Sequence, residues 1–230
     1  MKNKFNLIFI IGLEGSGHHL YKNLKINLSN PKVIQMHNLI LQYFNKGGDP
    51  RNLIKTRNKI FDFTKKNIGS SFYESSSFPF GRPTTPLNCI EILGFYELLK
   101  SIPHINFFFI VNTRNIIYST LSIQKRTNDK IIWSTRLQES CLVYINSQIQ
   151  LIPKEKYVIT DLDNISENIN KFEEYLKEKT KMDIYFNKNK VIKQNNSKYL
   201  KYKNYNYVFY YFSKKRIEQF IFLKNNTTLF

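Results

Sequence analysis

The sequence predicts an α/β fold with three layers, in which helices cover both faces of a central, mostly parallel sheet. Two long apolar runs, at residues 6–12 and 105–112, are too uninterrupted for strands with one face in water. Segments with helical periodicity separate these runs, and a cluster of glycines directly follows the first one. Buried strands that alternate with helices are typical of a parallel sheet covered on both faces.

Each element of this fold has its own signal in the chain. We expect strands where short apolar, β-branched or aromatic runs end at turn residues, at Asn6–Gly12, Lys32–Met36, Ser71–Ser75, Ile105–Asn112 and Lys156–Leu162. We expect helices at Gly17–Leu28, Asp49–Asn67, Leu87–Ser101, Asn115–Arg126, Lys130–Leu151, Ile165–Lys181 and Ser213–Leu223. The second helix has the clearest start, because Asp49 is a typical N-cap and Pro50 suits the first helical position.

Length and composition predict one folded domain of 230 residues, with a core at about 5–182 and a basic, Lys- and Tyr-rich part at about 183–230. A hydrophobic content of 42% excludes global disorder. Cys89 and Cys141 stand in no disulfide or metal-binding pattern, so we expect no metal. No apolar run reaches the ~18–20 residues of a membrane span, and the first run ends in glycines rather than in a cleavage site. We therefore expect a cytoplasmic protein.

The charge balance is unusual, because 35 Lys and Arg against 17 Asp and Glu give a net charge of +18. Such a surplus favours an anionic partner, which could be nucleic acid, anionic lipid, or a phosphorylated or sulfated small molecule. The stretch around Lys198, Tyr199, Lys201 and Lys203 interleaves basic and aromatic residues. That pattern suits single-stranded nucleic acid or a sugar chain, and it is equally compatible with a solvated basic surface.

The glycine cluster at the end of the first strand is the sharpest local signal. Its spacing is G-x-x-x-x-G from Gly12 to Gly17, followed by the two polar residues His18 and His19. Gly15 and Ser16 lie inside the loop. This is the pattern of a P-loop, in which backbone N–H groups and a helix N-terminus bind phosphate, with histidines in the Lys and Ser/Thr positions. A tight strand-to-helix turn is the alternative. Without the lysine and the hydroxyl, the loop suits a phosphate group bound without Mg²⁺ better than a kinase site.

A second candidate for anion binding follows the second long strand. Arg114 lies directly beyond Ile105–Asn112, and Ser122 lies eight positions later, on the next expected helix. The carboxyl end of a central strand is where α/β sheets bind ligands, and a guanidinium there can bind phosphate through two hydrogen bonds. Taken alone, an arginine in a surface ion pair and a serine on a solvated helix would explain the same residues.

Together these elements resemble the sulfotransferase family that uses 3′-phosphoadenosine 5′-phosphosulfate (PAPS). Its loop, G-x-x-[RK]-S-G-T-T-x-L, is matched at Gly12, Ser16, Gly17 and Leu20. Its R-[ND]-P-x-x-x-x-x-S segment is matched at Arg114, Asn115 and Ser122, with Ile116 in place of proline. Three further segments are similar to segments of the family. Ile159–Leu162 is similar to its Y-E-D-L segment, Phe72–Ser76 to its F-E-K-S segment, and Phe212–Phe230 to its closing helix and Phe/Leu-rich end.

The resemblance implies a sulfuryl transfer from PAPS to a hydroxyl or amine, without a metal. It assigns the 5′-phosphosulfate to the loop (Gly12, Gly15, Ser16, Gly17, His18 and His19) and the 3′-phosphate to Arg114 and Ser122. Two departures matter, because Gly15 and Ser75 replace cations that normally neutralise the transferring sulfate. Either the two histidines take over this role, or activity is weak or lost.

Two residues are candidates for the base that takes the acceptor's proton. His37 follows the expected strand Lys32–Met36, where several branches of the family place a catalytic carboxylate, and Glu74 lies in the F-E-K-S-like segment. An ordinary loop histidine and an ion-paired carboxylate are the alternatives. The acceptor is not identified, although the basic C-terminal part suits an acidic glycan.

Two other functions compete with this one. A small-molecule P-loop kinase would require Mg²⁺ and ATP, and the missing loop lysine argues against it. A nucleic-acid-binding protein would account for the +18 charge, but it gives no reason for the glycine cluster. We therefore expect no stable nucleic-acid partner.

Overall fold

The computed structural model describes residues 4–13, 16–17, 20–21, 24–25, 27–45, 50–78, 92–127, 131–187 and 214–230. In this part of the chain four strands form one all-parallel sheet in the order β2-β1-β3-β4. The strands are β1 (Phe5–Leu13), β2 (Ser71–Phe78), β3 (Ile105–Thr113) and β4 (Tyr157–Asp161). The predicted α/β class with a parallel central sheet is thus confirmed.

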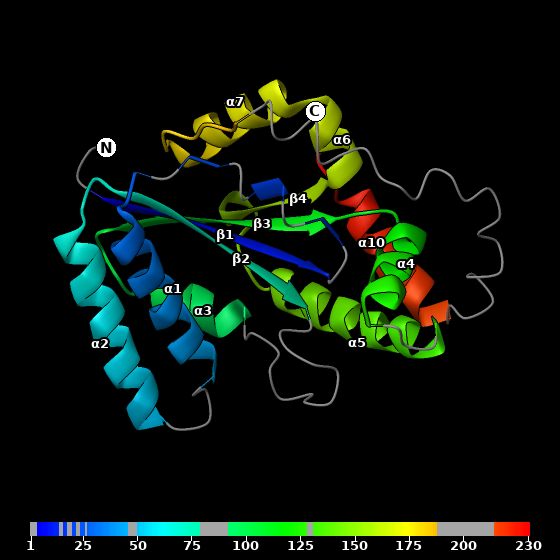
Figure 1. Cartoon of the computed structure of the whole chain (residues 1–230), viewed down its shortest axis with the longest axis horizontal. Helices are drawn as coiled ribbons and strands as arrows, with labels where there is room; N and C mark the ends of the chain where they lie inside the picture. Colours follow the sequence, from blue (N-terminus) through cyan, green and yellow to red (C-terminus); the bar gives the residue numbers. More distant parts are fainter. Residues whose placement is uncertain are drawn as a thin grey trace.

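Helices cover both faces of the sheet, as Figure 1 shows. On one face lie α1 (Asn30–Asn45), α2 (Pro50–Lys66), α3 (Ile92–Lys100) and α5 (Ile131–Ile149). On the other face lie α6 (Leu162–Glu167) and α7 (Ile169–Thr180). Two further helices, α4 (Ile116–Thr127) and α10 (Lys214–Asn225), pack against α5.

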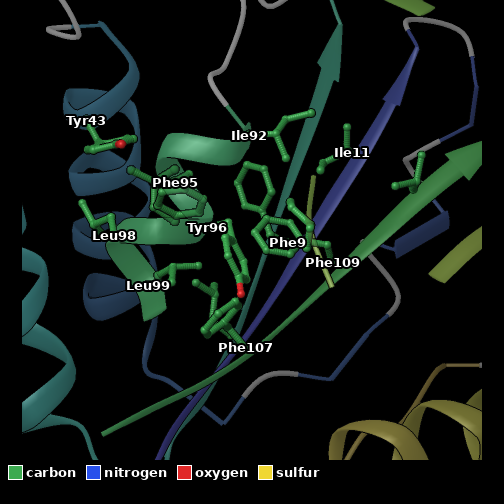
Figure 2. Close-up of a cluster of buried hydrophobic side chains, with 14 of the residues drawn as sticks. Phe9, Ile11, Tyr43, Ile92, Phe95, Tyr96, Leu98, Leu99, Phe107 and Phe109 are labelled. Atoms are coloured by element: carbon green, nitrogen blue, oxygen red, sulfur yellow. The ribbon is translucent and has the colours of Figure 1, made fainter. Parts of the chain in front are cut away.

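The face of α1, α3 and α5 is built on aromatic side chains, shown in Figure 2. The ring of Phe9 on β1 lies 5.0 Å from that of Phe95 on α3, between centroids, and 5.9 Å from Phe109 on β3. Phe95 in turn lies 5.4 Å from Tyr43 on α1. On β1, Phe9 and Ile11 face these helices, while Ile8 and Ile10 face α6 and α7. Both faces of β1 are therefore buried.

The opposite face is closed by segments from distant parts of the chain. Leu20, Tyr21 and Leu24 pack there with Phe172 of α7, and Leu24 forms a β-bridge with Phe186. The C-terminal end returns to the same region, since the Phe230 ring lies 5.0 Å from that of Phe172. Before that, Thr227 forms a bridge with Ile159 of β4.

Two expected elements differ in the structure. The expected strand Lys32–Met36 lies inside α1, because Val33, Met36, Ile40 and Tyr43 recur at the three- and four-residue spacing of one helix face. The expected helix Gly17–Leu28 is not an α-helix at its described positions. There, Leu20 and Leu24 donate hydrogen bonds to carbonyls three residues back, which is the spacing of a 3₁₀ turn rather than of an α-helix.

Other expectations are confirmed with adjusted bounds, or lie outside the described residues. The described part of the third expected helix is Ile92–Lys100, and its expected start at Leu87 lies outside the described residues. The Lys- and Tyr-rich stretch with Lys198, Tyr199, Lys201 and Lys203 lies outside the described residues as well. None of the described helices is long and apolar enough to cross a membrane.

Candidate functional site

The loop after β1 requires glycine at two positions for steric reasons. A Cβ atom on Gly12 would lie 2.4 Å from Oγ of Ser16, and one on Gly17 would lie 2.3 Å from Cδ2 of Leu162. Gly17 also has a φ of +81°, in the left-handed region that glycine favours. Gly15, His18 and His19 lie outside the described residues.

Ser16 has the chemistry of an anion-binding residue. Its side chain is 1% exposed, and its Oγ makes no hydrogen bond to any residue that the structure describes. In folded proteins a buried hydroxyl nearly always has a partner, and in a binding loop that partner can be an atom of the ligand. The space that a Cβ of Gly12 or Gly17 would take is filled by Ser16 and Leu162, so the two glycines let the chain pack closely around this hydroxyl.

Buried hydrogen bonds attach this loop to the ends of β3 and β4. Asn112 donates from Nδ2 to the carbonyl of Ser16 at 2.7 Å, and the Tyr21 hydroxyl donates to Asn112 Oδ1 at 3.1 Å. The same hydroxyl lies 3.2 Å from Oγ1 of Thr160. Burial raises the pKa of Tyr21 well above its ordinary value, so this hydroxyl keeps its proton.

Arg114 follows β3 directly, at the same edge of the sheet. Its guanidinium carbon lies 5.7 Å from the centroid of the Tyr118 ring on α4. The charge of Arg114 acts on Asp163. Burial raises the pKa of Asp163, the neighbouring Asp161 raises it further, and Arg114 lowers it. Ser122 is partly buried on α4, two turns beyond Arg114.

His37 and Glu74, the two candidate bases, form a pair. Nδ1 of His37 on α1 lies 2.8 Å from Oε2 of Glu74 on β2. The carboxylate is buried, while the imidazole is 44% exposed at the side chain. The hydrogen bond to Glu74 raises the pKa of His37, against the opposing effect of burial. When the Glu74 carboxylate accepts from Nδ1–H, Nε2 is the nitrogen that can take a proton.

The sheet brings the loop after β1 and Arg114 to the carboxyl ends of the strands. Gly12 pairs with Asn112 of β3 on one side and with Ser77 of β2 on the other. The loop therefore starts where the order of strands reverses around β1, which is the usual ligand site of an open parallel sheet. Glu74 lies three residues before Ser77, or about 10 Å back along the strand at roughly 3.3 Å per residue.

Some of these residues were predicted from sequence and others were missed. The structure brings together Gly12, Ser16, Gly17 and Arg114, and it pairs His37 with Glu74. It moves His37 from the end of a strand to a helix. Sequence reasoning missed Tyr21, Asn112 and Thr160, although Asn112 and Thr160 are polar residues at the ends of apolar runs, and that position was a usable signal. Among the described residues, no group of three His, Cys, Asp or Glu side chains could hold a metal ion.

Comparison with known proteins gives a relation at the level of the fold. No protein-family model matches the chain, and no curated protein does either. Among solved structures it is similar to the sulfotransferase domain from the Synechococcus PCC 7002 olefin synthase. The TM-score is 0.51 at 9% sequence identity, over 98% of this chain and 95% of that one. The protein therefore has a sulfotransferase-like α/β fold.

Proposed function

We propose that this protein is a sulfotransferase that uses PAPS to sulfate a hydroxyl or amine acceptor. One observation supports this most directly. In a sulfotransferase-like fold, the strand β1 ends at the topological switch point in a glycine loop whose buried Ser16 hydroxyl has no hydrogen-bond partner among the described residues. This geometry suits a phosphosulfate bound at the carboxyl ends of β1 and β3.

The loop and Arg114 would each bind one of the two anionic ends of the cofactor. Ser16 and the backbone around Gly17 would bind the 5′-phosphosulfate, together with Gly12, Gly15, His18 and His19. Arg114 and Ser122 would bind the 3′-phosphate. When bound, PAPS supplies an activated sulfuryl group, whose bond to the bridging phosphate oxygen breaks as the acceptor oxygen or nitrogen bonds to sulfur.

His37 would accept the acceptor's proton at Nε2 while Glu74 holds Nδ1–H. The imidazolium that forms is stabilised by the adjacent carboxylate, because the 2.8 Å contact becomes an ion pair. The pair combines the two sequence-based candidates into one acid–base unit, in which only His37 would touch the acceptor. The surplus of positive charge suits an acidic acceptor, such as a carboxylated or sulfated sugar chain.

Calorimetric titration tests the nucleotide. We expect the protein to bind adenosine 3′,5′-bisphosphate without added metal, and Arg114→Gln to weaken that binding by about tenfold or more, since hydrogen bonds to charged groups contribute roughly 1.5–3 kcal/mol. Arg136→Gln on α5 is the control for loss of one exposed arginine. Tighter binding of ATP with Mg²⁺ would instead favour a small-molecule kinase and overturn this proposal.

Transfer of labelled sulfate from PAPS to p-nitrophenol and to acidic oligosaccharides tests the reaction. His37→Ala should lower the turnover rate by about a hundredfold or more, within the usual range for a general base. Full turnover in both His37→Ala and Glu74→Ala would refute the base assignment.

A further inference from the structure

Asn112 occupies an unusual position for a carboxamide. It is 2% exposed at the end of β3, on the face that α6 and α7 cover, and both ends of its side chain are used. Nδ2 donates to the carbonyl of Ser16, and Oδ1 accepts from the hydroxyl of Tyr21. The side chain therefore connects the loop after β1 to the interior of the domain.

The Ser16 carbonyl fixes the orientation of the Asn112 amide, because a carbonyl oxygen can only accept and Nδ2 must therefore face it. Oδ1 then faces the Tyr21 hydroxyl and accepts its single proton. The Thr160 hydroxyl lies 3.2 Å from the Tyr21 oxygen and 3.5 Å from both Oδ1 and the Val111 carbonyl. With Oδ1 facing two hydroxyl groups, Nδ2 faces Ser16, and a reversed amide would place two acceptors against each other at 2.7 Å. Such chains strengthen one another in a buried environment.

The bond from Asn112 sets the orientation of one peptide unit. In a trans peptide, the carbonyl of one residue and the N–H of the next point in opposite directions. Because Asn112 holds the Ser16 carbonyl toward the interior, the N–H of Gly17 points away from it. Gly17 has a φ of +81° and lacks a Cβ, so this peptide would otherwise be among the easiest in the loop to rotate.

We infer that Asn112, held by Tyr21 and Thr160, is a positioning residue that aims the Gly17 N–H at the anion bound beside the Ser16 hydroxyl. The inference deepens the proposed function, on which it rests, by naming how the loop is prepared for the 5′-phosphosulfate. The arrangement supplies directional donors before the ligand arrives, and that lowers the reorganisation that binding would require.

The backbone amide of Gly17 provides the direct readout, followed by NMR during titration with inorganic pyrophosphate. We expect its resonance to shift in the wild-type protein and to stay fixed in Asn112→Leu. The matched control is Asn106→Leu, since Asn106 is on the same face of β3 and also donates to a backbone carbonyl at 2.7 Å, that of Thr180 at the opposite end of the sheet. Asn106→Leu should behave as the wild type does.

A pair of nucleotides separates positioning from a loss of overall structure. Asn112→Leu should weaken adenosine 3′,5′-bisphosphate by about tenfold or more and adenosine 3′-monophosphate by less than about twofold, since only the first presents a 5′-phosphate. Tyr21→Phe keeps the buried ring and removes the donor, and should weaken the bisphosphate by about two- to fivefold.

The outcomes are distinguishable. Equal weakening of both nucleotides in Asn112→Leu would mean a purely structural role, and it would overturn the inference. A Gly17 resonance that ignores pyrophosphate in the wild type would overturn it as well. A wild type that responds to pyrophosphate through Asn112 but binds neither nucleotide would refute the proposed function and keep the peptide-orienting role.

Discussion

Replacing Gly17 by alanine should destabilise the protein, and the structure gives the size of the effect. A left-handed φ of +81° costs a non-glycine residue about 1 kcal/mol. The new Cβ would also lie 2.3 Å from Cδ2 of Leu162, a side chain only 7% exposed that must shift within a packed core. Overpacking of this kind costs about 1–3 kcal/mol, so the two effects together amount to about 2–4 kcal/mol.

Urea unfolding measures this loss against a matched control. Gly69 has a φ of +85° and is exposed, so Gly69→Ala carries the cost of the backbone without that of the core contact. We expect the midpoint for Gly17→Ala to fall by ~1–2 M, and the midpoint for Gly69→Ala to fall by less than half of that. Equal destabilisation of the two variants would refute the packing of Gly17 against Leu162.

Other consequences can be tested in the same way. The hydrogen bond to Glu74 raises the pKa of His37 in the folded protein. The stability that this bond contributes is therefore fully present below the pKa of His37 in the unfolded chain, and it is lost as pH rises through the pKa of His37 in the folded protein. Unfolding should therefore show that Glu74→Gln costs more stability at about pH 5.5 than at about pH 9. Glu173→Ala should cost about 1–3 kcal/mol in urea unfolding, because it leaves the buried N–H of Phe186 without its 2.9 Å acceptor, whereas Glu173→Gln should cost much less. Phe95→Ala should cost about 3–5 kcal/mol in thermal or urea unfolding, since its ring contacts β1 and α1 at once.

The central strands could be predicted because burial on both faces produces a simple pattern in the sequence. β1 and β3 are buried on both faces, so apolar residues run without interruption through each, and the expected bounds fall within one residue of the observed ones. Residues 32–36 do not form such an uninterrupted apolar run. Five residues of mixed polarity fit a strand as well as a helix, and only the wider spacing of Val33, Met36, Ile40 and Tyr43 separates the two.

The site was predictable in part, for a related reason. Gly12 and Gly17 stand out because glycine is rare in this chain, with eight in 230 residues. The pairing of His37 with Glu74 was out of reach, because it depends on how α1 crosses the edge of the sheet beside β2, which no local pattern encodes. The Asn112 network is similar, because Tyr21 and Thr160 lie 91 and 48 positions from Asn112. Thr160 meets Asn112 through strand register, and Tyr21 reaches both from the segment after β1.

The net charge of +18 and the candidate site are separate features of this protein. The candidate site includes two described basic side chains, Arg114 and His37, and three carboxylates, Glu74, Asp161 and Asp163. Each carboxylate has a local counterpart: Glu74 bonds His37, Asp161 accepts from two N–H groups at the start of α6, and Asp163 lies in the field of Arg114. One arginine and one histidine against three carboxylates leave no positive surplus among these described side chains. On our proposal, recognition of an anion there would depend on directional donors, namely the Ser16 hydroxyl and the peptide that Asn112 orients, more than on a positive field. A phosphosulfate could then bind with glycine rather than a cation at position 15, and the positive surplus of the chain would attract an acidic acceptor.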